Sequence, residues 1–289
     1  MVQYRQVLIA GVNIFYREAG PREAPAIVLL HGFPSSSHMF RDLIRDLEGR
    51  FHVIAPDYPG FGNSAIPSPA EFEYTFDHLA QVMEEFLTTI GVARFSLYMQ
   101  DYGGPIGFRI ATRHPEWIEG LIVQNANAYV EGISDAFAPI RAFWKDRKQG
   151  ENAVRALLQR DTTVFQYTHG AKRPELISPD SYNSDQAFLD RPGNDAIQLE
   201  LLFNYQTNPA LYPEWQAYLS QHQPPTLIVW GKNDPFFLVR GAEAFRKDLR
   251  RPEIHLIDAG HFALEEAHEE IAGRIERFLS SNKTKGASQ

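Results

Sequence analysis

Three residues of the sequence combine types and positions that suit nucleophilic catalysis: Asp101, Asp234 and His261. Asp101 lies within Gln100-Asp-Tyr-Gly-Gly104, between a strand-like run and a helical pattern. A tight strand-to-helix turn of this kind lifts its central side chain above the carboxyl end of a sheet, beside helix amides that stabilise negative charge. We therefore interpret Asp101 as a nucleophile.

A carboxylate in such a turn favours a hydrolysis in two steps. An aspartate with an ordinary pKa of about 3.9 is ionised at neutral pH and attacks carbon without the help of a base. Attack on an sp³ carbon expels an alkoxide or a halide and leaves an alkyl ester on the protein. His261, held in one tautomer by Asp234, can then activate water against the ester carbonyl.

The elements that must position these residues alternate between strand-length apolar runs and longer helical patterns. This alternation is typical of a mostly parallel sheet covered by helices. The expected strands are 4–9 and 12–18, which read as an antiparallel pair, and 26–30, 51–55, 95–99, 121–123, 226–230 and 253–257. The expected helices are 37–48, 75–90, 104–114 and 264–280.

The alternation stops between residues 130 and 218, where the sequence becomes helical and rich in loops with scattered aromatic residues. We predict a helical cap at 130–218, inserted between a first core segment at 1–129 and a second at 219–289. The polar tail at 280–289 is expected to be disordered.

Composition narrows the classes of function. The 289 residues include no cysteine, which excludes disulfides and thiolate catalysis, and the net charge of -8 gives no electrostatic footprint for nucleic acid. No basic amphipathic helix for a membrane surface and no secretory signal is found, so a cytoplasmic location is expected. The sequence indicates a small, mostly apolar substrate. It contains no set of residues with the spacing of metal ligands, so neither a metal nor a cofactor is expected, and it leaves the oligomeric state open.

Five short motifs follow strand-like runs in a fixed order. They are His31-Gly-Phe-Pro34, Asp57-Tyr-Pro-Gly-Phe-Gly-Asn-Ser64, the turn at 99–104, Gly231-Lys-Asn-Asp234 and Gly260-His-Phe262. On these motifs nearly the whole chain resembles the α/β-hydrolase superfamily, and within it the branch with aspartate nucleophiles, the epoxide hydrolases and haloalkane dehalogenases. The resemblance implies an eight-stranded, mostly parallel sheet flanked by helices, with a helical cap.

The resemblance also implies roles for individual residues. Asp101 would be the nucleophile, Asp234 the acid and His261 the base, and the order along the chain agrees. The backbone N–H groups of Phe33 and Tyr102 would form the oxyanion hole. His31, by contrast, is interpreted as a structural histidine without a catalytic role.

The leaving group is the point on which the motifs conflict. Dehalogenases hold a halide with a tryptophan after the nucleophile and either an asparagine after the first His-Gly or a second tryptophan in the cap, whereas this chain has Tyr102 and Phe33 at the first two positions. Gln100 and Met99 nevertheless look dehalogenase-like. Trp144, at the start of the predicted cap, is then the candidate halide donor.

Epoxide hydrolases instead use two cap tyrosines to bind the epoxide oxygen and donate a proton. Tyr167 and Tyr212 fall near the expected places, with Tyr205 in reserve. The first hypothesis is an epoxide hydrolase that forms a vicinal diol, and the second is a haloalkane dehalogenase with the same three residues. A third, from a different class, is a member of the fold that binds a small molecule without turning it over.

Overall fold

An eight-stranded sheet forms the centre of the protein, and the prediction of such a mostly parallel sheet is confirmed. The computed structural model describes residues 1–286. The strands are β1 (Gln3–Ile9), β2 (Val12–Ala19), β3 (Ala26–Leu30), β4 (His52–Pro56), β5 (Phe95–Gln100), β6 (Ile118–Gln124), β7 (Thr226–Gly231) and β8 (Glu253–Ile257). Their order is β1-β2-β4-β3-β5-β6-β7-β8.

The direction of the strands decides where the loops meet. β2 runs antiparallel to both β1 and β4, and every other neighbouring pair is parallel. β5 is central, with Met99 in register with Leu30 of β3 and Val123 of β6. The carboxyl ends of β3, β5, β6, β7 and β8 therefore lie on one edge of the sheet, which brings their loops together.

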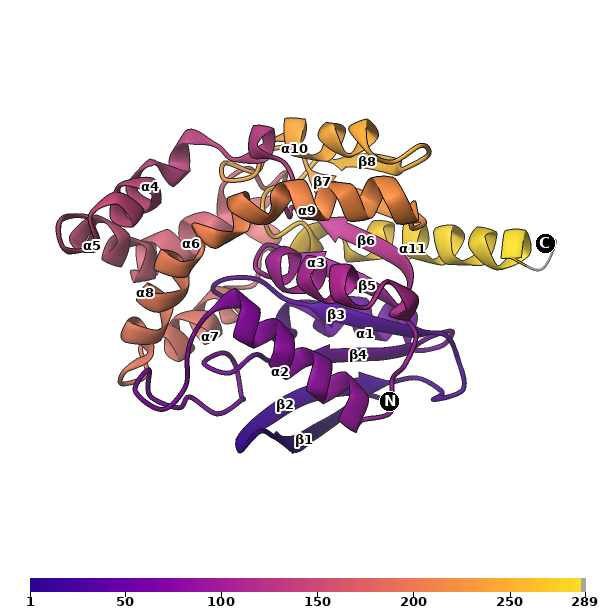
Figure 1. The fold of residues 1–289 in the computed structure, drawn as a ribbon, viewed down its shortest axis with the longest axis horizontal. Helices are drawn as coiled ribbons and strands as arrows, with labels where there is room; N and C mark the ends of the chain where they lie inside the picture. The colour runs from indigo at the N-terminus through magenta and orange to yellow at the C-terminus, as the bar shows by residue number, and fades with distance from the viewer. Residues whose placement is uncertain (287–289) are drawn as a thin grey trace.

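Helices cover both faces of the sheet because side chains of a buried parallel strand alternate between the two faces. In β3, Ile27 and Leu29 join one hydrophobic cluster with α1 (Arg41–Leu47) and α11 (Leu264–Gly286). Val28 and Leu30 join the other, with α2 (Phe76–Thr89), α3 (Gly103–Arg113) and α10 (Val239–Ala244). In Figure 1, α2 and α3 lie in front of the sheet.

Helix α2 shows why these segments become helices. Its buried residues recur at a spacing of three and four, which puts them on one face. The Thr75 side chain accepts a hydrogen bond from the His78 N–H and so satisfies one of the free amides at the start of the helix. Truncating a buried side chain such as Phe86 to alanine costs about 3–5 kcal/mol in proteins.

The chain between β6 and β7 folds into a run of helices, as predicted for the insertion. They are α4 (Ala138–Lys145), α5 (Arg147–Arg155), α6 (Arg160–Thr168), α7 (Pro179–Leu189), α8 (Asn194–Asn204) and α9 (Thr207–His222). Helices α4 to α8 gather beyond one end of the sheet, whereas α9 runs back along α3 (Figure 1). α9 continues past the predicted boundary at residue 218, to His222.

The expectation of a disordered tail at 280–289 is wrong for its first part. α11 extends to Gly286, with a kink at Ala267, and residues 287–289 lie outside the described part of the chain. Ile275 and Phe278 of α11 are buried against the sheet. Because helix propagation beyond packed turns is much easier than nucleation, the polar end continues the same helix.

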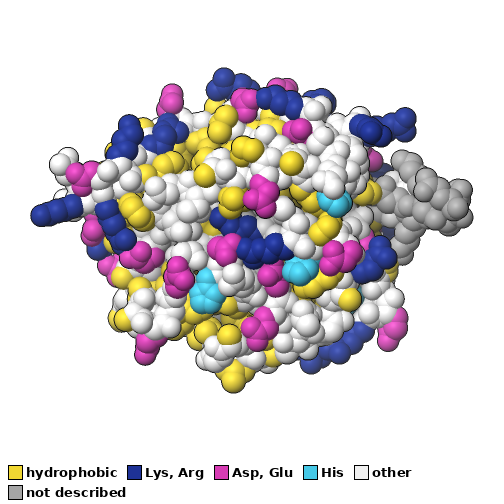
Figure 2. All heavy atoms as spheres, in the orientation of Figure 1, with side chains coloured by type: hydrophobic (Ala, Val, Ile, Leu, Met, Phe, Trp, Pro, Cys, Tyr) yellow, Lys and Arg dark blue, Asp and Glu magenta, His cyan; other side chains and the backbone are white. Residues whose placement is uncertain are grey.

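The surface over α2 and α3 carries charges of both signs, mixed rather than segregated (Figure 2). Arg113 of α3 contacts both Asp77 and Glu84 of α2. Exposed pairs of this kind each contribute little to stability. Within the described residues, no helix is long and apolar enough to cross a membrane.

Candidate active site

Asp101 occupies the turn between β5 and α3 in a strained conformation. Its φ is +48°, in the left-handed region that non-glycine residues rarely adopt. The turn closes because two glycines leave room: a Cβ on Gly103 would lie 2.2 Å from the carbonyl oxygen of Leu30, and one on Gly32 would lie 2.3 Å from the Cβ of Asp101. The predicted turn thus presents Asp101 at the carboxyl edge of the sheet.

The Asp101 carboxylate is held by backbone amides. Its Oδ1 accepts a hydrogen bond of 2.6 Å from the Phe33 N–H, and the Tyr102 N–H also acts on it. Burial raises the pKa of Asp101 to about 6, although His261 and these two amides oppose the shift. The carboxylate is therefore mostly ionised at pH 7, but less completely than an aspartate with the ordinary value of 3.8.

His261 follows β8, and its ring lies near both carboxylates. Its Nδ1 lies 2.7 Å from Oδ2 of Asp234, and its Nε2 lies 3.9 Å from Oδ2 of Asp101. Burial lowers the pKa of His261, but the Asp234 carboxylate and then Asp101 outweigh burial, so that the pKa is raised above 6.5. The structure thus brings all three predicted residues together at one edge of the sheet.

Asp234 is fixed by groups that sequence reasoning missed. Its Oδ1 accepts hydrogen bonds from the N–H groups of Phe236 and Phe237, at 2.7 and 3.1 Å. Its Oδ2 accepts one of 2.7 Å from the side-chain amide of Asn125. A carboxylate with this many donors remains a rigid acceptor for the imidazole.

Asn125 connects the two halves of the site. Its side-chain amide both donates to and accepts from the backbone of Gly231. Its backbone carbonyl oxygen accepts a hydrogen bond of 3.2 Å from the Asp101 N–H. Its φ is +42°, which asparagine tolerates better than most residues. An asparagine two residues after the predicted strand 121–123 was the signal available in the sequence.

A small cavity of about 50 Å³ opens onto Asp101 and His261. Its wall is mostly aromatic and aliphatic, and more than half of the lining residues come from the segment between β6 and β7. The lining residues are Phe33, Asp101, Tyr102, Ala136, Phe137, Ile140, Leu157, Thr162, Gln166, Leu202, Tyr205, Phe236, Phe237 and His261. Such a wall suits a small and largely apolar ligand.

The three candidate tyrosines of the cap, Tyr167, Tyr205 and Tyr212, lie in different places. Only Tyr205, the reserve candidate, lines this cavity. Tyr205 is among the lining residues, with its ring centroid 5.9 Å from that of Tyr102. Tyr212 lies outside the cavity wall, and its side chain is fully buried. Tyr205 rather than Tyr212 is therefore the tyrosine that can reach a ligand.

Tyr167 faces away from the cavity, contrary to its predicted role. Its hydroxyl donates a hydrogen bond of 2.5 Å to Oδ2 of Asp185 in α7, and its ring stacks on Phe262 at 3.9 Å between centroids. On helix α6 the preceding residue, Gln166, lines the cavity instead. A step of one residue turns a helical side chain by about 100°, which moves Tyr167 to the other side.

Trp144 is likewise not placed as a halide donor. Its indole N–H donates a hydrogen bond of 2.9 Å to the carbonyl oxygen of Leu202, and its ring stacks behind Tyr205 at 6.2 Å. The N–H is therefore already used by the backbone, and Trp144 is not part of the cavity wall. It supports Tyr205 from behind.

His31 has the surroundings of a structural residue. Its Nδ1 lies 3.1 Å from the carbonyl oxygen of Gly32, its Nε2 accepts from the Tyr58 N–H, and its ring stacks on that of Tyr58. Burial lowers its pKa to about 3, so it stays neutral.

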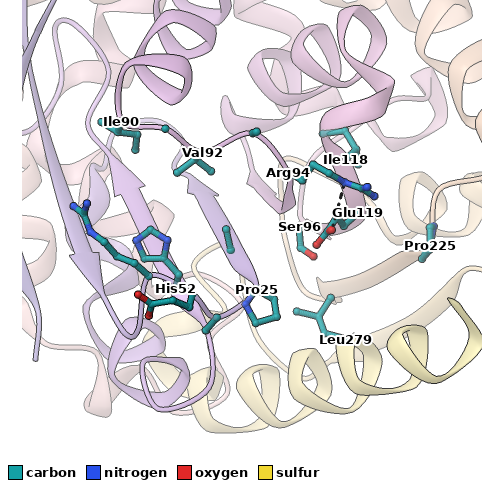
Figure 3. Close-up of a pocket in the computed structure, with 16 residues that line it drawn as sticks. Pro25, His52, Ile90, Val92, Arg94, Ser96, Ile118, Glu119, Pro225 and Leu279 are labelled. Atoms are coloured by element: carbon teal, nitrogen blue, oxygen red, sulfur yellow. Dashed lines mark ion pairs between the residues drawn. The ribbon is translucent and has the colours of Figure 1, made fainter. Parts of the chain in front are cut away.

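A larger hollow, of about 750 Å³, lies at the opposite edge of the sheet, at the amino ends of β3, β4, β5 and β6 (Figure 3). Most of its ionisable groups are already paired: Arg94 lies 3.5 Å from Glu119, and both Arg22 and the buried His52 contact Glu18. In parallel sheets of this type ligands bind at the carboxyl edge. The small cavity at Asp101 is therefore the candidate active site.

Comparison with known proteins identifies the family. The sequence matches the α/β hydrolase fold family over residues 25–268. It is 42% identical to an uncharacterized hydrolase of Saccharomyces cerevisiae, over 94% of this chain and 95% of that protein. It is 36% identical to a haloalkane dehalogenase of Bradyrhizobium diazoefficiens, with 94% and 92% covered. A cis-3-alkyl-4-alkyloxetan-2-one decarboxylase of Xanthomonas campestris is 26% identical, with 94% of each chain covered.

Solved structures share the fold at lower sequence identity. A haloalkane dehalogenase of Bradyrhizobium elkani superposes with a TM-score of 0.80 at 21% identity, covering 99% of this chain and 100% of that one. An epoxide hydrolase gives 0.77 at 20% identity, with 97% and 99% covered. The chain belongs to the α/β hydrolase fold family, and a haloalkane dehalogenase is among its relatives above 30% identity.

Proposed function

We propose that this hydrolase opens epoxides to vicinal diols through an ester on Asp101. The observation that carries the proposal is the position of Tyr205. Besides Tyr102, it is the only tyrosine in the described cavity wall. Opening an epoxide leaves an alkoxide, which needs a proton, whereas a halide leaves without one. A tyrosine hydroxyl can supply that proton, and Tyr205 lines the same small cavity as Asp101.

In the first step the Asp101 carboxylate attacks one ring carbon. The C–O bond of the epoxide breaks, the alkoxide oxygen takes a proton from Tyr205, and an alkyl ester of Asp101 remains. Oδ1 accepts a hydrogen bond from the Phe33 amide, and the Tyr102 amide also acts on the carboxylate, so Oδ1 suits the oxygen that becomes the ester carbonyl. The attacking oxygen is then Oδ2.

In the second step water attacks the carbonyl carbon of the ester. His261 takes the proton through Nε2, while Asp234 stabilises the imidazolium that forms. Negative charge on Oδ1 is met by the same two amides, and losing one donor of that type typically costs about 10²–10³ in rate. Collapse of the tetrahedral intermediate expels the diol oxygen, which takes the proton from His261, and the proton left on the Asp101 carboxyl group passes through water to the Tyr205 phenolate, so that the carboxylate, the neutral imidazole and the tyrosine are restored.

The test is to stop the enzyme between the two steps. The His261→Gln variant is mixed with 1,2-epoxybutane or styrene oxide, and its intact mass is measured, followed by peptide mapping. We expect a mass increase of one epoxide molecule on the peptide that contains Asp101, and none in the Asp101→Ala variant. With wild-type enzyme in excess over epoxide in H₂¹⁸O, the label should enter Asp101 rather than the diol.

A haloalkane dehalogenase is the second candidate, because a relative with that name is 36% identical to the chain. The same nucleophile and base would serve, but the cavity lacks the tryptophan that the resemblance requires, since the described lining includes none. Halide release from 1-bromobutane, compared with diol formation from 1,2-epoxybutane, separates the two. A protein that only binds small molecules would give neither product nor adduct.

A further inference from the structure

Gln100, the residue before the candidate nucleophile, contacts the imidazole of the candidate base. Its side chain is completely buried at the end of β5, and its Nε2 lies 3.1 Å from Nε2 of His261. Its Oε1 is buried without a hydrogen-bond partner and lies against Gly32. The amide is thus packed into one place, with its NH₂ group toward the ring.

Gln124 contacts the same histidine from the next strand. Gln100 and Gln124 are in register at the ends of β5 and β6. The Gln124 Nε2 donates to the backbone carbonyl of His261 at 3.4 Å, and its Oε1 accepts from the Tyr98 hydroxyl. One glutamine therefore contacts the ring of His261 and the other its backbone.

The contact of Gln100 depends on the protonation state of His261. Nδ1 of His261 lies 2.7 Å from Oδ2 of Asp234 and so carries a proton, which leaves Nε2 of the neutral ring as an acceptor. Gln100 can donate to that lone pair. In the imidazolium form Nε2 carries a proton as well, and two N–H groups would face each other across 3.1 Å.

We propose that Gln100 is a positioning residue that favours the neutral form of His261 and fixes the orientation of its ring until the ester on Asp101 has formed. This inference rests on the proposed function. Without Gln100, a protonated His261 could pair with the Asp101 carboxylate, whose Oδ2 is only 3.9 Å from Nε2. Such a pair would occupy both the nucleophile and the base. When water enters, it replaces Gln100 at the lone pair of Nε2.

The titration of His261 tests the proposal directly. The titratable groups that act on its ring are Asp234, after β7, and Asp101, after β5, and both favour the imidazolium. Gln100→Met keeps the size of the side chain but removes the donor. We expect the pKa of His261, followed by NMR of ¹⁵N-labelled histidine with His261→Gln for assignment, to rise by about 0.5–1 unit, the effect of one net hydrogen bond.

Two further variants control the measurement. Gln100→Glu places an acceptor against Nε2, so the pKa should rise further than with methionine. Gln124→Met disturbs the neighbouring position but not the ring contact, and it should leave the pKa of His261 unchanged. Thermal unfolding of each variant establishes that it is folded.

The pH profile of ester hydrolysis gives a second measurement. The acid limb of the single-turnover hydrolysis rate should move upward in Gln100→Met by the same amount as the pKa of His261. An unchanged or lowered pKa in Gln100→Met overturns the proposal, because the amide would then play only a packing role or would present its oxygen to the ring. The NMR titration does not depend on turnover, so it remains decisive if no ester is ever trapped.

Discussion

The imidazole of His261 and the carboxylate of Asp101 lie 3.9 Å apart, between Nε2 and Oδ2, beyond hydrogen-bond distance. A serine nucleophile would need the histidine in contact to remove its proton. A carboxylate has no proton to lose once it is ionised, so the gap does not hinder its attack. Because no hydrogen bond joins the two side chains, Nε2 of His261 is not committed to Asp101 before the second step.

The first prediction concerns the pH dependence of ester formation. Burial raises the pKa of Asp101 to about 6, and only the ionised form attacks. The rate of ester formation, measured by rapid quench with enzyme in excess, should therefore rise with pH through about 6 and then level off. Between pH 5 and pH 7 we expect an increase of roughly tenfold.

The background opening of epoxides in acid is measured with the Asp101→Ala variant and subtracted. In His261→Gln the midpoint should move upward, because the imidazolium that favours the Asp101 carboxylate is gone. A midpoint near 3.8, the ordinary value, would contradict the effect of burial.

The second prediction compares Tyr205 with Tyr212, two tyrosines of the insertion. Tyr205→Phe should lower kcat for 1,2-epoxybutane by about 10²-fold, the lower end of what a general acid contributes. Tyr212→Phe should have a smaller effect, because Tyr212 lies outside the cavity wall. Steady-state diol formation measures both.

Any activity with 1-bromobutane provides the internal control, since bromide leaves without a proton and should be insensitive to Tyr205→Phe. Equal losses for both substrates would mean that Tyr205 shapes the cavity and is not the proton donor.

The sequence predicted the parts of the site that depend on strand ends. Asp101, Asp234 and His261 each follow an apolar strand, and parallel strands must end at one edge, so their proximity follows from local patterns and topology. Their roles in catalysis remain predictions. The same reasoning located all eight strands to within a few residues.

The insertion could not be predicted to the same level. Helix α6 is buried on more than one side, so its pattern does not reveal that Gln166 faces the cavity and Tyr167 faces α7. Tertiary packing, rather than helical periodicity, decides which face meets the nucleophile. For the same reason, nothing in the sequence showed that the Trp144 N–H is bonded to the backbone of Leu202.

The third prediction concerns Asn125, the connection between Asp101 and Asp234. Asn125→Ala removes donors and acceptors from the buried Gly231 and Asp234, and it places alanine at a φ of +42°. We expect a loss of about 1–3 kcal/mol in the free energy of unfolding. The rate of ester hydrolysis should fall more than that of ester formation, because Asp234 acts through His261.

Asn125→Gly separates the two causes, since glycine adopts a positive φ without strain. The loss common to both variants belongs to the side-chain hydrogen bonds, and the difference between them to the backbone. Urea unfolding and single-turnover kinetics give the two measurements. Equal slowing of both chemical steps would show that Asn125 acts on the backbone of Asp101 as well.

The fourth prediction concerns Asp185, whose carboxylate accepts a hydrogen bond from the hydroxyl of Tyr167. Burial raises the pKa of Asp185 to about 7, although the hydroxyl groups of Tyr167 and Ser35 oppose the shift. The folded state therefore binds a proton here more tightly than the unfolded chain, whose value is near 3.8. The contribution of Asp185 to stability is greatest below that value and falls as the pH rises to about 7.

Asp185→Asn cannot ionise, so its stability relative to wild type should increase with pH up to about 7, by at most about 1.4 kcal/mol per pH unit, and then stay constant. Unfolding measured at several values from pH 5 to pH 8 tests this. The control is Asp195→Asn, because Asp195 is exposed and Arg155 lowers its pKa, so this variant should gain nothing as the pH rises. If the Asp185→Asn and wild-type curves run parallel, Asp185 is already charged at pH 5, and its contact with Tyr167 stabilises the carboxylate more than burial destabilises it.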